Sequence, residues 1–138
     1  MAERQPLIHA LLADARQRAL DDPATAPHAG RIDLRHIDAA RLLEGGESWD
    51  VIYLDPMYPD TRKSALPSRE MQMLRDLSGG DADADALLEP ARRAARQRVM
   101  VKRPAHAPWL AAQKPDLSLR GTQLRFDIYF SKSESANH

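Results

Sequence analysis

The chain has 138 residues, 43% of them hydrophobic, which is enough for about one domain with a core, and its 20 basic residues balance its 20 acidic ones. Net charge therefore indicates no polyanionic partner, and the absence of cysteine together with 5 histidines that lack metal-ligand spacing predicts no metal site. No apolar run approaches the ~18 residues of a membrane span and the polar start is unlike a signal peptide, so we expect a cytoplasmic protein.

The first part of the chain predicts helices that alternate with short strands. Apolar residues recur at helical spacing over residues 6–20, and a proline-rich surface loop is expected at 22–30. Alternation of apolar and polar residues predicts a short strand at 32–36. A short helix is expected at 39–43, closed by two glycines, and "DVIYLD" at 50–55 predicts a strand covered by helices on both faces.

The second part continues the alternation and ends in a hairpin. Helices are expected at 68–77 and 83–97, with Pro90 as a kink or boundary in the second. "RVMVK" at 98–102 predicts another buried strand. Two strands flanking a Gly-Thr pair predict an antiparallel hairpin at 117–130.

Helix and strand in alternation favour a mainly parallel sheet with helices on both faces. Ligands of such α/β folds bind at the carboxyl ends of the strands. Asp38, Asp55 and Lys102 with Arg103 follow three of the predicted strands, so we expect these side chains to share one edge of the sheet.

The stretch "DPMYPD" after the central strand has the chemistry of an amine site. Proline holds the preceding Asp55 extended, so its carboxylate and the Pro56 carbonyl can both accept hydrogen bonds from one amino group. Tyr58 offers a stacking face for a nucleobase, worth roughly 1–3 kcal/mol, and an unstacked nucleotide is the easier target. Taken alone, Asp-Pro is equally typical of an ordinary turn at the end of a strand.

"DPMYP" resembles the D-P-P-Y motif of amino-group methyltransferases that use S-adenosylmethionine. Together with "ERQPLIHALLADARQRA", "KSAL", "LLEPAR" and "RVMVKRP", in this order, it resembles the methyltransferase J family over about residues 2–130. That family methylates guanine N2 in 16S rRNA of the small ribosomal subunit. The resemblance therefore implies 16S rRNA or the small subunit as the partner of this chain. The resemblance implies the α/β, Rossmann-like fold of class I S-adenosylmethionine-dependent methyltransferases.

The resemblance also implies roles for particular residues. Glu3 is expected to bind the ribose hydroxyls of S-adenosylmethionine with Arg4 beside it, and Asp38 with Ala39 to contact the adenine. Asp55 is expected where the methionine end of the cofactor meets the target amine. With Pro56 and Tyr58 it would form the catalytic set, Tyr58 stacking on the guanine.

Several of these residues also have simpler interpretations. Glu3 near a terminus is typically a solvated acid, and Asp38 can cap the helix that follows it. Lys102 and Arg103 either contact RNA phosphate or are solvated charges at a strand end. Lys63 lies in a loop that could close over the target.

The family fold begins with strands and a glycine-rich turn that this chain lacks. We therefore expect a fragment, a partial methyltransferase domain over residues 1–130 with a polar tail at 131–138, lacking strands 1 and 2 of the family sheet. Those strands would lie in the middle of the sheet, so their loss is expected to leave unpaired edges and weak or no activity.

Two other classes of function stay open from the sequence. D-P-P-Y-like turns also serve amino methyltransferases that act on DNA or on a protein glutamine. A non-catalytic domain that keeps the fold and binds RNA or a protein partner is the third possibility.

Overall fold

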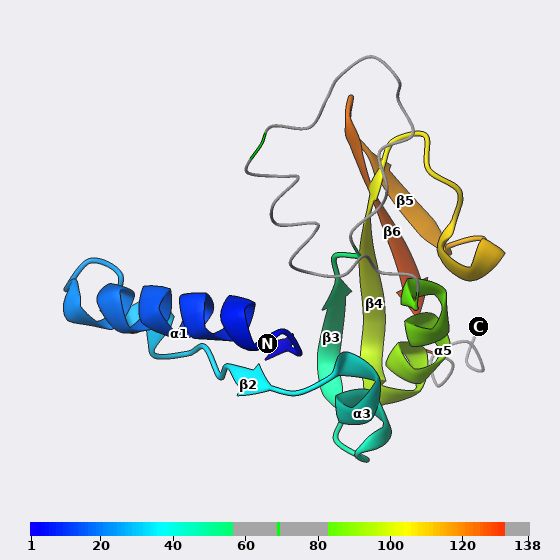
Figure 1. The fold of residues 1–138 in the computed structure, drawn as a ribbon. Coiled ribbons are helices and arrows are strands. Elements are labelled where there is room, and N and C mark those ends of the chain that lie inside the picture. The colour runs from blue at the N-terminus through cyan, green and yellow to red at the C-terminus, as the bar shows by residue number, and fades with distance from the viewer. Residues whose placement is uncertain (57–68, 70–82, 132–138) are drawn as a thin grey trace.

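The computed structural model describes residues 1–56, 69 and 83–131, which form two separate β-sheets with helices beside them (Figure 1). The smaller sheet is a parallel pair and the larger has four strands in the order β3-β4-β6-β5. The strands are β1 (Ala2–Glu3), β2 (Arg35–His36), β3 (Trp49–Leu54), β4 (Ala95–Pro104), β5 (Leu117–Arg120) and β6 (Leu124–Phe130). The helices are α1 (Pro6–Asp21), α2 (Ala26–Ala29), α3 (Ala39–Glu44), α5 (Ala84–Ala94) and the 3-10 turn η1 (Leu110–Ala112).

Helix α1 extends from the smaller sheet away from the larger one (Figure 1). Its predicted span is confirmed, with Pro6 in the first turn. Leu7 and Leu11 are 52% and 54% exposed, and no residue of α1 is buried by the part of the chain that the structure describes. The predicted loop at 22–30 is wrong in part, because it contains the one-turn helix α2.

The larger sheet is mixed, so the prediction of a mainly parallel sheet is wrong. Strand β3 runs parallel to β4, whereas β6 is antiparallel to both β4 and β5. The predicted hairpin is confirmed, but its second strand lies between β4 and β5. The sheet is therefore mixed because the hairpin joins it through β6, which runs antiparallel to β4.

One face of the larger sheet carries the core. Leu88 and Ala91 of α5 pack against Val99 and Val101 of β4 and Tyr129 of β6, and all five are fully buried. Alternation along a strand places these β4 side chains on the same face. Helix α5 runs through Pro90 and ends at Ala94, so the predicted helix at 83–97 is too long and its last residues belong to β4.

The opposite face of the sheet is open within the described residues. Val51 and Tyr53 of β3 are exposed, as are Leu117 and Leu119 of β5. The prediction that residues 50–55 are covered on both faces is therefore wrong for the described part of the chain. The strand's apolar composition resembles that of a doubly covered strand, but only Ile52 and Leu54 pack against the core.

The C-terminal end of the described chain is held in place. Ser131 is buried, and its amide and hydroxyl groups bind the carbonyls of Gln97 and Arg96. The expected polar tail therefore does not include Ser131. The rest of that tail and the predicted helix at 68–77 lie outside the described residues, apart from Arg69. No helix among the described residues is long and apolar enough to cross a membrane.

Candidate active site

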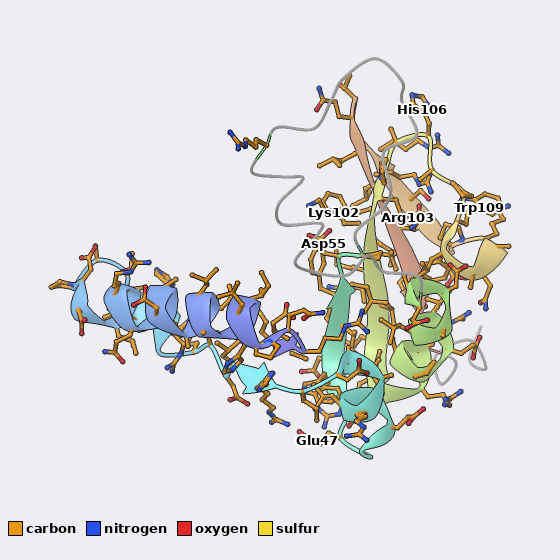
Figure 2. All side chains as sticks on the ribbon, viewed as in Figure 1. Glu47, Asp55, Lys102, Arg103, His106 and Trp109 are labelled. Carbon is orange, nitrogen blue, oxygen red and sulfur yellow. The ribbon has the colours of Figure 1, made fainter. Side chains whose placement is uncertain are left out.

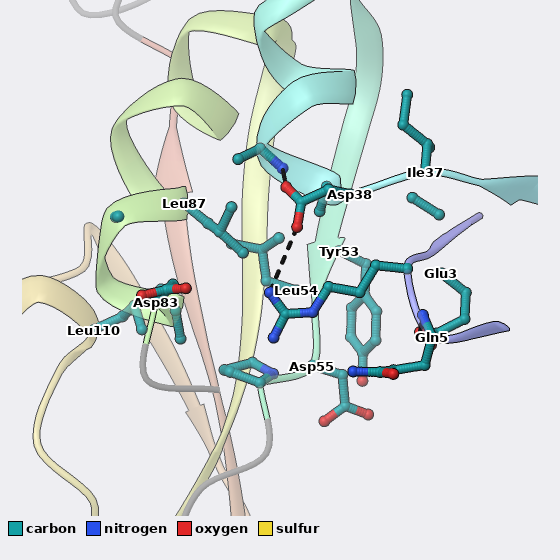
Figure 3. Close-up of a pocket in the computed structure, with 17 residues that line it drawn as sticks. Glu3, Gln5, Ile37, Asp38, Tyr53, Leu54, Asp55, Asp83, Leu87 and Leu110 are labelled. Carbon is teal, nitrogen blue, oxygen red and sulfur yellow. Dashed lines mark hydrogen bonds and ion pairs between the residues drawn. The ribbon is translucent and has the colours of Figure 1, made fainter. Parts of the chain in front are cut away.

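A cavity of about 320 Å³ opens where the two sheets meet (Figure 3). It lies at the end of β1, the start of α3, the end of β3 and the start of α5. Its walls are residues 2–5, 37–40 and 53–56, together with Asp83, Ala84, Ala86, Leu87 and Leu110. The structure thus brings together six residues that the sequence singled out: Glu3, Arg4, Asp38, Ala39, Asp55 and Pro56.

Glu3 stands at the carboxyl end of β1 and faces the cavity (Figure 3). Its Oε1 accepts a hydrogen bond from the Gln5 amide at 2.7 Å. This bond turns the chain from the strand into α1 and fixes the carboxylate close to the backbone. Glu3 is half-buried, so its interpretation as a fully solvated acid is wrong.

Asp38 caps the helix that follows it. Its Oδ1 accepts from the Ala40 amide at 2.9 Å, which confirms the prediction of an N-cap for α3. Its Oδ2 lies 3.5 Å from Nη1 of Arg4, across the cavity wall. The cap orients the carboxylate, and the long contact to Arg4 leaves Oδ2 the more available oxygen.

Asp55, which directly follows β3, forms an ion pair with Lys102, which lies within the neighbouring strand β4 (Figure 2). Nζ of Lys102 donates to Oδ2 of Asp55 at 3.1 Å. This hydrogen bond and the charge of Asp55 raise the pKa of Lys102, so Lys102 carries its positive charge at neutral pH. The parallel pairing of β3 and β4 brings Asp55 and Lys102 side by side, as the sequence predicted. The predicted common edge is otherwise wrong, because Lys102 and Arg103 lie within β4 and Asp38 follows a strand of the smaller sheet.

Arg103 points to the other side of the strand and is only 5% exposed. Its Nε and Nη2 donate to the Pro108 carbonyl at 3.2 and 2.8 Å. Neither sequence interpretation of Arg103 matches this position, because a buried guanidinium is not a solvated charge and does not face an external phosphate. It holds the connection after β4 against the sheet.

The apolar walls of the cavity were missed by sequence reasoning. Leu87 of α5 and Leu110 of η1 are distant in sequence from Glu3, Asp38 and Asp55, and nothing in their local sequence indicates that they line a cavity. Tyr53 was treated only as a strand residue, although its strand position beside Asp55 was an available signal. Tyr58 and Lys63 lie outside the described residues, so their predicted roles stay predictions.

The cavity has no cluster of metal-binding side chains among the described residues. No group of three His, Cys, Asp or Glu side chains in that part of the chain could hold a metal ion. The expectation that the protein uses no metal stays a prediction.

Parallel strands whose carboxyl ends carry carboxylates around a cavity define an α/β domain of the kind that binds a nucleotide-like cofactor. A family described as "Putative SAM-dependent methyltransferase" matches residues 1–131. The chain belongs to this family, whose cofactor is S-adenosylmethionine, as the sequence predicted.

Curated relatives extend the comparison to methyltransferase J. A protein of Pseudomonas paraeruginosa named ribosomal RNA small subunit methyltransferase J is 50% identical over 135 residues, which cover 96% of this chain and 52% of the relative. One of the same name from Actinobacillus pleuropneumoniae is 43% identical over 99% of this chain and 55% of its own length. The resemblance to that family is confirmed, and the chain spans about half the length of these relatives.

A solved structure supports the fold. The crystal structure of a SAM-dependent methyltransferase from Neisseria gonorrhoeae matches with a TM-score of 0.76 and 35% identity, over 99% of this chain and 55% of that one. The predicted class I methyltransferase fold, as a partial Rossmann-like arrangement, is therefore confirmed.

The residues of the cavity fit S-adenosylmethionine in their chemistry. Carboxylates suit the hydroxyl and amino groups of a nucleoside, because each oxygen can accept an O–H or N–H. Glu3 and Asp38 supply them on one side of the cavity, and Leu87 and Leu110 supply apolar surface on another. The cavity's volume also lies in the usual range for small-molecule sites, roughly 300–1,000 Å³.

Proposed function

We propose that the protein containing this chain transfers a methyl group from S-adenosylmethionine to the exocyclic N2 of a guanine in 16S rRNA. The observation that carries the proposal is the position of Asp55 and Pro56, which line the same cavity as Glu3 and Asp38. The candidate site for the target amine and the candidate site for the nucleoside part of the cofactor thus lie in the same cavity. The names of the curated relatives support a ribosomal substrate.

The chain's own residues would position the two reactants. Glu3 and Asp38 would hold the cofactor, with Arg4 and Ala39 beside them. When bound, the cofactor supplies an electrophilic methyl group. The Asp55 carboxylate and the Pro56 carbonyl would accept the two N–H bonds of the target amine, which directs the nitrogen lone pair toward that methyl group.

The base must leave its stack before it can enter such a cavity. Unstacking costs a few kcal/mol, so a loop nucleotide is the favoured substrate. Tyr58, by stacking, and Lys63, by closing over the target, complete the proposed substrate site. A substrate on the small ribosomal subunit also places the protein in the cytoplasm.

Replacing Asp55 by Ala tests the proposal. The chain spans about half the length of its relatives, so the assay uses two proteins. One is the chain alone, and the other is a chimera in which residues 1–131 replace the matching segment of the Pseudomonas paraeruginosa relative. We expect labelled methyl transfer to small-subunit RNA to fall at least ~100-fold, the scale for loss of one preorganised polar group.

Asp50→Ala is the matched control, since Asp50 is an exposed acid at the other end of β3. Transfer at the normal rate by Asp55→Ala contradicts the proposal. Label that enters DNA or a protein glutamine instead of RNA indicates one of the other amino methyltransferases, and a chimera that binds RNA but transfers no label indicates a binding domain.

A further inference from the structure

Lys102 contacts Asp55 without lining the cavity that Asp55 faces. Figure 2 shows the two side chains together where β3 ends beside β4. Among the described residues, Lys102 is thus attached to the proposed amine site only through the carboxylate. This is the position of a group that acts on Asp55 and not directly on a ligand.

The strand register explains why these two residues meet. Leu54 of β3 pairs with Val101 of β4 in parallel, so Asp55, the first residue after β3, comes level with Lys102, which lies within β4. Side chains alternate between faces, so Lys102 shares a face with Asp55 while Arg103 turns to the buried side. The contact is therefore set by the sheet and not by a flexible loop.

The contact occupies one oxygen of the carboxylate. Nζ of Lys102 binds Oδ2, and no described residue donates a hydrogen bond to Oδ1 of Asp55. A carboxylate rotates about its last bond, so a fixed partner on one oxygen also fixes the direction of the other.

We propose that Lys102 is a positioning residue whose ammonium group holds Oδ2 of Asp55 and thereby directs Oδ1 to the target amine. The inference rests on the proposed function and replaces the RNA-phosphate contact expected for Lys102. The side chains of the pair are 34% and 50% exposed, and such pairs contribute little to stability. The pair matters for the orientation of the Asp55 carboxylate, because an error of 1 Å in the position of a reacting group can cost ~100-fold in rate.

The test compares Lys102→Met, Lys102→Arg and Asp55→Asn, singly and as the double variant Asp55→Asn with Lys102→Met, in the chain alone and in the chimera. The control is Arg96→Met, which breaks the corresponding β3–β4 ion pair with Asp50, 3.3 Å long, at the other end of the strands. Rates are measured at saturating S-adenosylmethionine, with kcat and KM for RNA determined at several salt concentrations.

We expect Lys102→Met to lower kcat ~10–100-fold with KM for RNA unchanged, and Lys102→Arg to recover most of the loss. The double variant should be no slower than Asp55→Asn alone, because Lys102 acts through that carboxylate. Arg96→Met should behave like the unsubstituted protein. Lys102→Gln takes the place of the Met variant if the latter does not fold.

A phosphate contact gives the opposite pattern and overturns the inference. KM for RNA would then rise, its salt dependence would flatten, and the effects of the Asp55 and Lys102 substitutions would add. Failure of the proposed function is seen separately, because the unsubstituted protein would then methylate no RNA before any variant is compared.

Discussion

Tyr129 is the largest fully buried side chain of the core, and its hydroxyl group has a single described acceptor. It donates to the Gln113 carbonyl at 2.9 Å, and the Arg92 guanidinium lies 5.9 Å from its ring centre. Burial, with a smaller contribution from the charge of Asp127, raises the pKa of Tyr129 to about 12. The folded chain therefore holds this proton more tightly than the unfolded chain, where tyrosine ionises near pH 10.

This difference makes stability depend on pH at the alkaline end. A pKa that is raised on folding contributes stability that is complete below about pH 10 and is lost as pH rises toward 12. Between about pH 9 and 12 we expect the unsubstituted chain to lose about 2–3 kcal/mol more unfolding free energy than Tyr129→Phe. Urea unfolding of both proteins across this range checks it, and parallel pH curves would contradict it.

The hairpin of β5 and β6 is the element that ties the chain's last third together. Arg125 and Asp127 form a bidentate pair with side chains 4% and 0% exposed, both contacts 2.8 Å long. Ser118 of β5 donates to the same carboxylate, and Arg125 donates to the Ala105 carbonyl. The pair thus joins both strands of the hairpin to the connection that follows β4.

Breaking this pair should be costly because it leaves a charge buried without its partner. We expect Arg125→Met to lower the free energy of unfolding by about 3–5 kcal/mol, and Arg125→Met with Asp127→Leu to recover much of that loss. Arg120→Met, an exposed change on β5, should have little effect. Chemical denaturation of the three variants decides it, and a double variant less stable than Arg125→Met would contradict the explanation.

At the scale of the whole molecule, the two sheets share a cavity but no strand pairing within the described residues. Strand β3 is an edge of the larger sheet and faces the smaller one. Apolar side chains are exposed on α1, β3 and β5: Leu7, Leu11, Val51, Tyr53, Leu117 and Leu119. A zero formal net charge adds no repulsion between copies.

From this arrangement we expect the 138-residue chain alone to be poorly soluble and to bind S-adenosylmethionine at best weakly. The cavity's walls come from both sheets, so any relative motion of the sheets separates Glu3 and Asp38 from Asp55. Calorimetric titration of the isolated chain measures this, with the chimera as the control for competent binding. Micromolar affinity in the isolated chain would show that the sheets are held together well enough without strand pairing.

Local patterns along the chain were enough to predict α1, α3, the hairpin, the Asp38 cap and the position of Asp55 at a strand end. Helical and strand periodicity, capping and turn chemistry act over a few neighbouring residues, so they can be read from the order of residues alone. That Asp55 comes beside Lys102 followed from the rule that parallel strands expose their carboxyl ends together, whereas the place of Glu3 followed from the family resemblance.

The partners of these elements depended on contacts between distant parts of the chain. No local sequence pattern indicates four features of the structure. These are the insertion of β6 beside β4, the open face of β3, the burial of Arg103 and the place of Leu87 and Leu110 in the cavity wall. Each depends on which surface a distant segment covers, and burial, unlike periodicity, is a property of the packed molecule. For the same reason, the Lys102–Asp55 pair became visible only when the register between β3 and β4 was known.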